Sequence, residues 1–195
     1  ITSVPISVTY AYTLTANGNS VTQNVVVIVK PTPVLTSSLT PPSICSGTIF
    51  SYIPTSSISG VTFNWTRAAV AGISNPPASG MGNPNETLDN TTSAPANVTY
   101  VYTLSVNGCT NPAVYSIIAT VNPIPVVTNA STITISSGTS PNISLTSTTP
   151  STFSWTIGTI TGGITGATAG SGSTINQILT NPSNTVEGTV QYIVN

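Results

Sequence analysis

Few side chains in this chain could do chemistry, and the closest pair is Glu86 and Asp89 in the stretch GNPNETLDN. Two carboxylates at this spacing could act as general acid and general base if a cleft set their pKa values apart. The whole chain has three acidic residues, two basic residues and no histidine. Histidine-based catalytic triads and histidine-ligated metals are therefore excluded. We interpret the two carboxylates as loop residues and predict that the protein is not an enzyme.

The same stretch could bind calcium weakly, because asparagines lie next to its carboxylates. It lacks the spaced D-x-[DN]-x-[DN]-G pattern of a calcium loop, so we expect no metal and no cofactor. The two basic residues, Lys30 and Arg67, cannot neutralise a row of phosphates, which excludes nucleic-acid binding. Lys30 could instead join an asparagine in an isopeptide bond, as in some surface adhesins, but a solvated lysine is the simpler interpretation.

Two segments of the sequence recur at one fixed offset. VTYAYTLTANG at Val8 to Gly18 returns as VTYVYTLSVNG at Val98 to Gly108, and TFNWT at Thr62 to Thr66 returns as TFSWT at Thr152 to Thr156. The period of about 90 residues is that of a small domain, so we expect an array of similar domains.

The frame of the repeats predicts three parts. Residues 1–32 match the C-terminal part of a preceding repeat, residues 33–123 make one complete repeat, and residues 124–195 match the N-terminal part of a third. Because both ends fall inside a repeat, we expect this chain to be a segment of a longer polypeptide.

The composition favours strands over helices. Valine, isoleucine and threonine dominate the ordered-looking stretches, and 38% hydrophobic residues with a net charge of -1 argue against disorder. Large apolar residues alternate with smaller ones from Val98 to Leu104, and the Asn-Gly pairs at Asn17 and Asn107 predict tight type I′ hairpins. These features predict an all-β fold of tandem immunoglobulin-like antiparallel β-sandwiches.

Proline pairs mark the boundaries between repeats. Pro31 and Pro33 precede the complete repeat, Pro123 and Pro125 follow it, and both pairs would stiffen a short linker. The longest aliphatic run, residues 25–29, is too short to cross a bilayer, so we expect no membrane insertion.

Aromatic side chains recur in step with the repeats, which favours a structural role. The residues that we assign to the core are Phe63, Trp65, Phe153, Trp155, Tyr100 and Tyr102. The alternative is an exposed aromatic stripe that binds sugars. We favour core packing because the T-F-x-W-T spacing follows the period of the fold.

The two cysteines, Cys45 and Cys109, lie in the same complete repeat. Asn19 stands in the place of Cys109 in the first part, and Ser137 lies near the place of Cys45 in the third. Joint presence and joint absence predict a disulfide within one sandwich, which would stabilise it by about 4 kcal/mol and indicate an oxidising, extracellular compartment. The alternative is a pair of free buried thiols.

The order ICSGT, FNWT, ETLDNTT, VTYVYTLSVNGC and ATVNPIP along the chain is similar to the PKD-like, immunoglobulin-like repeats of giant Bacteroidetes cell-surface proteins. The resemblance extends to the third part. It implies export by the type IX secretion system and display on the outer surface as a repetitive adhesin of the gliding-motility type. Repeats of this family usually carry both cysteines, and their motif contributes no catalytic residue.

We therefore expect a structural or adhesive segment of a long extracellular bacterial surface fibre that spaces or presents a binding tip. Its expected partners are neighbouring repeats, surface glycans or other cells reached through further domains, and copies of itself. Two alternatives stay open. One is a self-assembling filament subunit that uses strand complementation, and the other is the non-catalytic stalk of a secreted hydrolase.

Overall fold

The computed structural model describes residues 4–195, and the fold in this range is built from strands, turns and loops without a helix. The all-β fold predicted from composition and alternation is therefore confirmed. No helix in the described range is long and apolar enough to span a membrane. The chain divides into two compact units, Ile1–Asn122 and Pro123–Asn195, which we describe separately.

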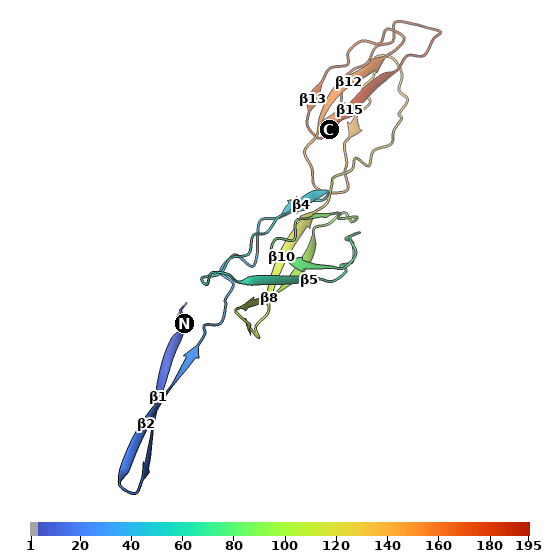
Figure 1. The fold of residues 1–195 in the computed structure, drawn as a ribbon. Coiled ribbons are helices and arrows are strands. Elements are labelled where there is room, and N and C mark those ends of the chain that lie inside the picture. The colour runs from blue at the N-terminus through green and yellow to red at the C-terminus, as the bar shows by residue number, and fades with distance from the viewer. Residues whose placement is uncertain (1–3) are drawn as a thin grey trace. The chain divides into compact units, whose positions relative to one another are not determined.

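The first unit begins with a hairpin and continues into a β-sandwich (Figure 1). Its strands are β1 (Ile6–Ala16), β2 (Asn19–Val29), β3 (Ile44–Cys45), β4 (Thr48–Phe50), β5 (Thr62–Arg67), β6 (Ala78–Met81), β7 (Glu86–Leu88), β8 (Ala96–Val106), β9 (Cys109–Thr110) and β10 (Tyr115–Asn122). The larger sheet has the order β3-β10-β8-β5-β6, with β9 paired to β8, and β4 pairs with β7 in a second sheet.

The core of the sandwich follows from the alternation along β8. Val98, Tyr100, Tyr102 and Leu104 are fully buried, whereas the side chains between them are partly or largely exposed. Tyr100 stacks on Phe50 of β4 with ring centroids 5.0 Å apart, which joins the two sheets. Buried side chains of β5, β7 and β10 complete this core: Trp65, Leu88, Ile117, Ala119 and Val121.

The hairpin β1–β2 has no such core, and all residues of both strands are exposed. Its turn has positive φ at Asn17 (50°) and Gly18 (79°), and the β8–β9 turn has nearly the same values at Asn107 and Gly108. Both Asn-Gly pairs therefore form the type I′ geometry that they predict.

The second unit is a smaller sandwich with strands β11 (Ile143–Ser144), β12 (Ser154–Ile160), β13 (Gly170–Ser171), β14 (Thr174–Ile175) and β15 (Val190–Val194). Three strands form a sheet in the order β13-β12-β15, and β11 pairs with β14. Leu145, Trp155 and Ile175 form its buried core.

The same packing contact occurs within each unit, and it fixes the tryptophan of the T-F-x-W-T strand. Trp65 lies opposite Gly80 on the neighbouring strand, and Trp155 lies opposite Gly170. A Cβ atom at either glycine would lie 2.8 Å or 2.7 Å from the indole ring, respectively. The glycines are therefore required for the rings to lie flat on the neighbouring strand.

Candidate functional site

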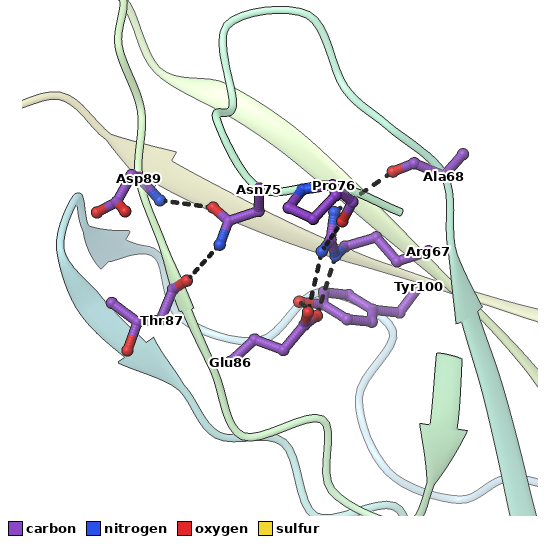
Figure 2. A network of polar contacts seen from close by, with 8 residues as sticks. All are labelled: Arg67, Ala68, Asn75, Pro76, Glu86, Thr87, Asp89 and Tyr100. Carbon is purple, nitrogen blue, oxygen red and sulfur yellow. Dashed lines mark hydrogen bonds and ion pairs between the residues drawn. The ribbon is translucent and has the colours of Figure 1, made fainter. Parts of the chain in front are cut away.

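Two charged residues of the sandwich, Arg67 and Glu86, meet the hydroxyl group of Tyr100 in a largely buried cluster (Figure 2). Arg67 ends β5 on the same face as Trp65, Glu86 begins β7, and Tyr100 lies in the middle of β8. Arg67 is 2% exposed although it carries a charge, so its environment must satisfy the guanidinium group.

The guanidinium group is satisfied by four hydrogen bonds, and a fifth joins its partner Glu86 to Tyr100. Nε donates to Oε2 of Glu86 at 2.9 Å and Nη2 donates to Oε1 at 2.9 Å, which makes the pair bidentate. Nη2 also donates to the carbonyl oxygen of Pro76 at 2.6 Å, and Nη1 donates to that of Ala68 at 3.5 Å. The hydroxyl group of Tyr100 donates to Oε2 of Glu86 at 2.7 Å. Bidentate geometry with extra donors is the arrangement that makes a buried ion pair tolerable.

The environment shifts the pKa values of all three groups. The hydrogen bond to Glu86 raises the pKa of Arg67 above its ordinary value, although burial opposes this. Burial raises the pKa of Glu86, but hydrogen bonds from Arg67 and Tyr100 outweigh that effect and hold it below its ordinary value. Burial, together with the Glu86 carboxylate, raises the pKa of Tyr100. Near neutral pH, Arg67 is therefore protonated, Glu86 is ionised and Tyr100 is neutral.

The two carboxylates that could form an acid–base pair do not converge. Glu86 faces inward to Arg67, whereas Asp89 lies beyond the end of β7 and its side chain points away from Glu86 in Figure 2. Oδ1 of Asn75 accepts a hydrogen bond from the backbone NH of Asp89 at 2.9 Å. Nδ2 of Asn75 donates one to the carbonyl oxygen of Thr87 at 2.7 Å. These contacts hold the loop after β7, so Asn75 and Asp89 have structural roles.

No cluster of metal ligands forms in residues 4–195, since no three histidine, cysteine, aspartate or glutamate side chains gather there. A shallow open groove of about 400 Å³ lies in the second unit. Its lining residues are Leu145, Thr146, Ser147, Thr148, Thr149, Pro150, Ser151 and Phe153. None of these side chains is ionisable near neutral pH, so the lining provides no general base to activate its serine and threonine hydroxyl groups.

The predicted disulfide between Cys45 and Cys109 is not formed, and both cysteines are free. Cys45 pairs with Asn122 beside the first residue of β8, whereas Cys109 pairs with Val106 at its last residue. At about 3.3 Å per residue, the 11 residues of β8 separate these two ends by roughly 33 Å. A disulfide needs Cα atoms about 4.4–6.8 Å apart, so this pair cannot bond within one sandwich.

The alternative of two buried thiols is not observed either, because Cys45 is exposed and Cys109 is half-buried. In the second unit the residue in the place of Cys45 is Ser136. The hydroxyl of Thr139 donates to the Ser136 carbonyl oxygen at 2.6 Å, as the hydroxyl of Thr48 does to that of Cys45.

The aromatic residues assigned to the core lie in the two hydrophobic clusters. Trp65 and Trp155 are 5% and 6% exposed, and Tyr100 and Tyr102 are fully buried. Phe63 and Phe153 are half-buried and pack against the clusters. The structure thus brings each tryptophan and its phenylalanine to the interior, and they do not form an exposed stripe.

The ion pair was not predicted from the sequence, which was used only to exclude nucleic-acid binding by Arg67 and to interpret Glu86 as a loop residue. A comparison between the repeats carries the signal. Ile157 stands in the place of Arg67, and Gln177 stands in the place of Glu86, where it contacts the hydroxyl of Tyr192 at 3.1 Å. Loss of the cation and loss of the carboxylate occur together, as expected for two partners in contact.

The fold and this cluster define a β-sandwich module in which the ion pair of Arg67 and Glu86 lies in the interior. Comparison with protein families gives the same class: residues 42–125 match the model of the PKD-like domain, and this stretch covers most of the complete sandwich. PKD-like domains are generally non-catalytic structural modules and are typically extracellular. The comparisons with curated proteins and with solved structures found no match.

Proposed function

We propose that this chain is a structural or adhesive segment of a long extracellular bacterial surface fibre, in which tandem PKD-like sandwiches space or present a binding tip. The observation that carries the proposal is that the same interior contacts occur within each unit, whereas no reactive side chains converge in residues 4–195. Tyr102 lies opposite Trp65 in the first unit, and Val194 lies opposite Trp155 in the second. The features that the two units have in common are contacts of their interiors.

A second contact that occurs within each unit supports the proposed array of repeats. The hydroxyl of Ser46 accepts the backbone NH of Asn90 at 2.8 Å, and that of Ser137 accepts the backbone NH of Asn181 at 3.0 Å. The side-chain amide of each asparagine also donates to a carbonyl oxygen a few residues later, that of Ala94 or Val186. A contact that is kept in two separate units supports the interpretation that they are equivalent repeats. Residues 1–32, 33–123 and 124–195 would accordingly be the end of one repeat, a complete repeat and the start of another.

The proposed context is the outer surface of a bacterium that exports the protein by type IX secretion, as an adhesin of the gliding-motility type. The nearly uncharged surface supports a spacer role, because two basic and three acidic residues leave few charges to attract ligands or respond to salt. The alternative of a stalk attached to a secreted hydrolase uses the same modules, and only the function of the remaining protein separates the two.

Antibodies against residues 33–123 would test this proposal on intact cells of the source bacterium. We expect surface labelling that disappears after external proteolysis, and a polypeptide far larger than 19.8 kDa on a reducing gel. Deletion of the gene should reduce attachment to surfaces or other cells. Labelling only after lysis would contradict the proposal, and loss of a secreted hydrolytic activity with normal attachment would favour the stalk.

A further inference from the structure

The two cysteines lie at opposite ends of the complete repeat, and each of these ends adjoins a neighbouring repeat. Cys45 is the strand partner of Asn122, the last residue of β10, and the second unit begins at Pro123. Cys109 is the strand partner of Val106, at the other end of β8. Both positions are fixed by strand pairing inside the complete repeat, so they do not depend on where the sequence begins or ends.

The linker before the complete repeat contacts the turn that carries Cys109. Nζ of Lys30 donates to the carbonyl oxygen of Asn107 at 3.2 Å. The buried side chain of Asn111 donates from Nδ2 to the carbonyl oxygen of Pro33 at 2.8 Å, and Pro33 itself is fully buried. Cys109 lies in the chain between these two contacts, so it is placed at the junction with the preceding repeat.

The equivalence of the repeats places the other kind of cysteine at the same junction. The β1–β2 ladder matches the β8–β10 ladder pair for pair, which makes Lys30 the equivalent of Asn122. Because Asn122 pairs with Cys45, the residue in the place of Cys45 in the preceding repeat would pair with Lys30. The distance to Lys30 would be one strand spacing of about 4.8 Å. Lys30 in turn contacts the turn that precedes Cys109.

We propose that disulfides join the complete repeat to its two neighbours. Cys109 bonds to a cysteine in the place of Cys45 in the preceding repeat, and Cys45 bonds to a cysteine in the place of Cys109 in the following repeat. This inference rests on the array of repeats proposed above, and the partner thiols belong to parts of those repeats outside the printed sequence. In each bond two thiols lose two electrons and two protons to a protein disulfide of the export compartment, which is reduced to two thiols.

The geometry favours this pairing over a bond within one repeat. Within the repeat, the length of β8 keeps the two cysteines roughly 33 Å apart. Across a junction, the separation is one strand spacing and the reach of the Lys30 side chain to the turn. A small movement of the linker at residues 30–33 then brings the two Cα atoms into the range of about 4.4–6.8 Å that a disulfide needs.

The residues that replace the cysteines in the other units agree with this assignment. Asn19 stands in the place of Cys109 in the first part, and Ser136 stands in the place of Cys45 in the second unit. Both belong to junctions further out in the array, which would therefore have no such bond. The complete repeat is then joined to each neighbour by a linker and a disulfide, whereas the outer junctions depend on their linkers alone.

The thiols of the native polypeptide test this proposal. The protein is denatured without reductant, its free thiols are alkylated with iodoacetamide, and it is digested with chymotrypsin, because trypsin has only Lys30 and Arg67 to cleave in this stretch. Mass spectrometry should find Cys45 and Cys109 each linked to a peptide from outside residues 33–123. We expect no alkylated form of either cysteine before reduction, and both should react after reduction.

Two substitutions in the full polypeptide identify the pairs. Cys45→Ser should free one thiol in the following repeat and leave Cys109 bonded. Cys109→Ser should free one thiol in the preceding repeat and leave Cys45 bonded. The isolated 195-residue chain is the matched control, because it lacks both partners and both of its thiols should stay free.

Free thiols at Cys45 and Cys109 in the native polypeptide would overturn the proposal. So would a bond between these two cysteines, which Cys45→Ser would reveal by freeing Cys109. A species of twice the polypeptide mass on a non-reducing gel would assign the bonds to separate copies and would overturn it as well.

The spacer role is tested separately by the surface labelling and attachment described above. Free thiols with normal labelling and attachment would remove the bonds and leave the spacer role in place. Bonds between repeats in a protein that labels only after lysis would do the reverse.

Discussion

Arg67 and Glu86 form a bidentate ion pair inside the sandwich, with side chains that are only 1% and 18% exposed. These two residues come from strands that belong to different sheets, so their contact ties the sheets together at the level of the core. The next unit places Ile157 and Gln177 at the same positions, and it therefore supplies a natural neutral version for comparison.

Removing one partner of the pair should be far worse than removing both charges. Arg67→Ile leaves the Glu86 carboxylate partly buried with only the Tyr100 hydroxyl as a donor, which should cost about 3–5 kcal/mol in the free energy of unfolding. Adding Glu86→Gln recreates the neutral arrangement of the second unit and should restore most of that loss. Urea unfolding followed by Trp65 fluorescence, with Trp155→Phe as the common background, measures both. Equal losses in the single and double variants would contradict this interpretation.

The ion pair also predicts that the complete sandwich is sensitive to acid. The pKa of Glu86 is lower in the folded state than its ordinary value of 4.5, so the unfolded chain binds the proton more tightly. Its stabilising contribution is therefore fully present above about pH 4.5, and is lost as the pH falls through the folded value. The urea midpoint of the first unit should drop between pH 7 and pH 3. The Arg67→Ile, Glu86→Gln double variant should lose this part of the dependence, and a retained dependence would assign it to other groups.

The positions of the cysteines predict that reducing agents do not change the stability of the sandwich. Cys45 and Cys109 lie at opposite ends of β8, so a reductant has no bond within the sandwich to break. Cys45→Ser with Cys109→Ser should change the free energy of unfolding by no more than about 0.5 kcal/mol. A thiol reagent should modify the exposed Cys45 in the folded 195-residue chain. A large shift of the unfolding midpoint on reduction would show that the two ends approach each other.

The contact between glycine and tryptophan predicts sensitivity to one added methyl group in both units. Gly80→Ala and Gly170→Ala would place a Cβ atom less than 3 Å from the ring of Trp65 or Trp155. Each should destabilise its unit by about 1–3 kcal/mol, because the ring has to move out of a packed position. Ser79→Ala, at the exposed residue beside Gly80, is the matched control and should be nearly neutral. Thermal unfolding followed by near-UV circular dichroism reports both changes.

The all-β fold could be predicted from the sequence alone because its information is local. Alternation from Val98 to Leu104 identifies the buried face of β8, and Asn107-Gly108 identifies the turn that follows it. Recurrence of the T-F-x-W-T segment predicts that similar units occur more than once. These signals come from residues adjacent in the chain, where strand period and turn geometry constrain the backbone directly.

Contacts between residues that are distant in the chain could not be predicted from such local signals. The sequence placed Cys45 and Cys109 near the two ends of one repeat and suggested a bond, yet in three dimensions the length of β8 separates them. The joint replacement of Arg67 and Glu86 in the second unit is a sequence signal that they are partners, but only the structure shows that they meet across the two sheets. Pairing of charges and thiols depends on strand order and on which strand ends coincide, and these are properties of the packed sandwich. The sequence by itself determined the strands, turns and repeats, and only the tertiary structure decided which of their side chains meet.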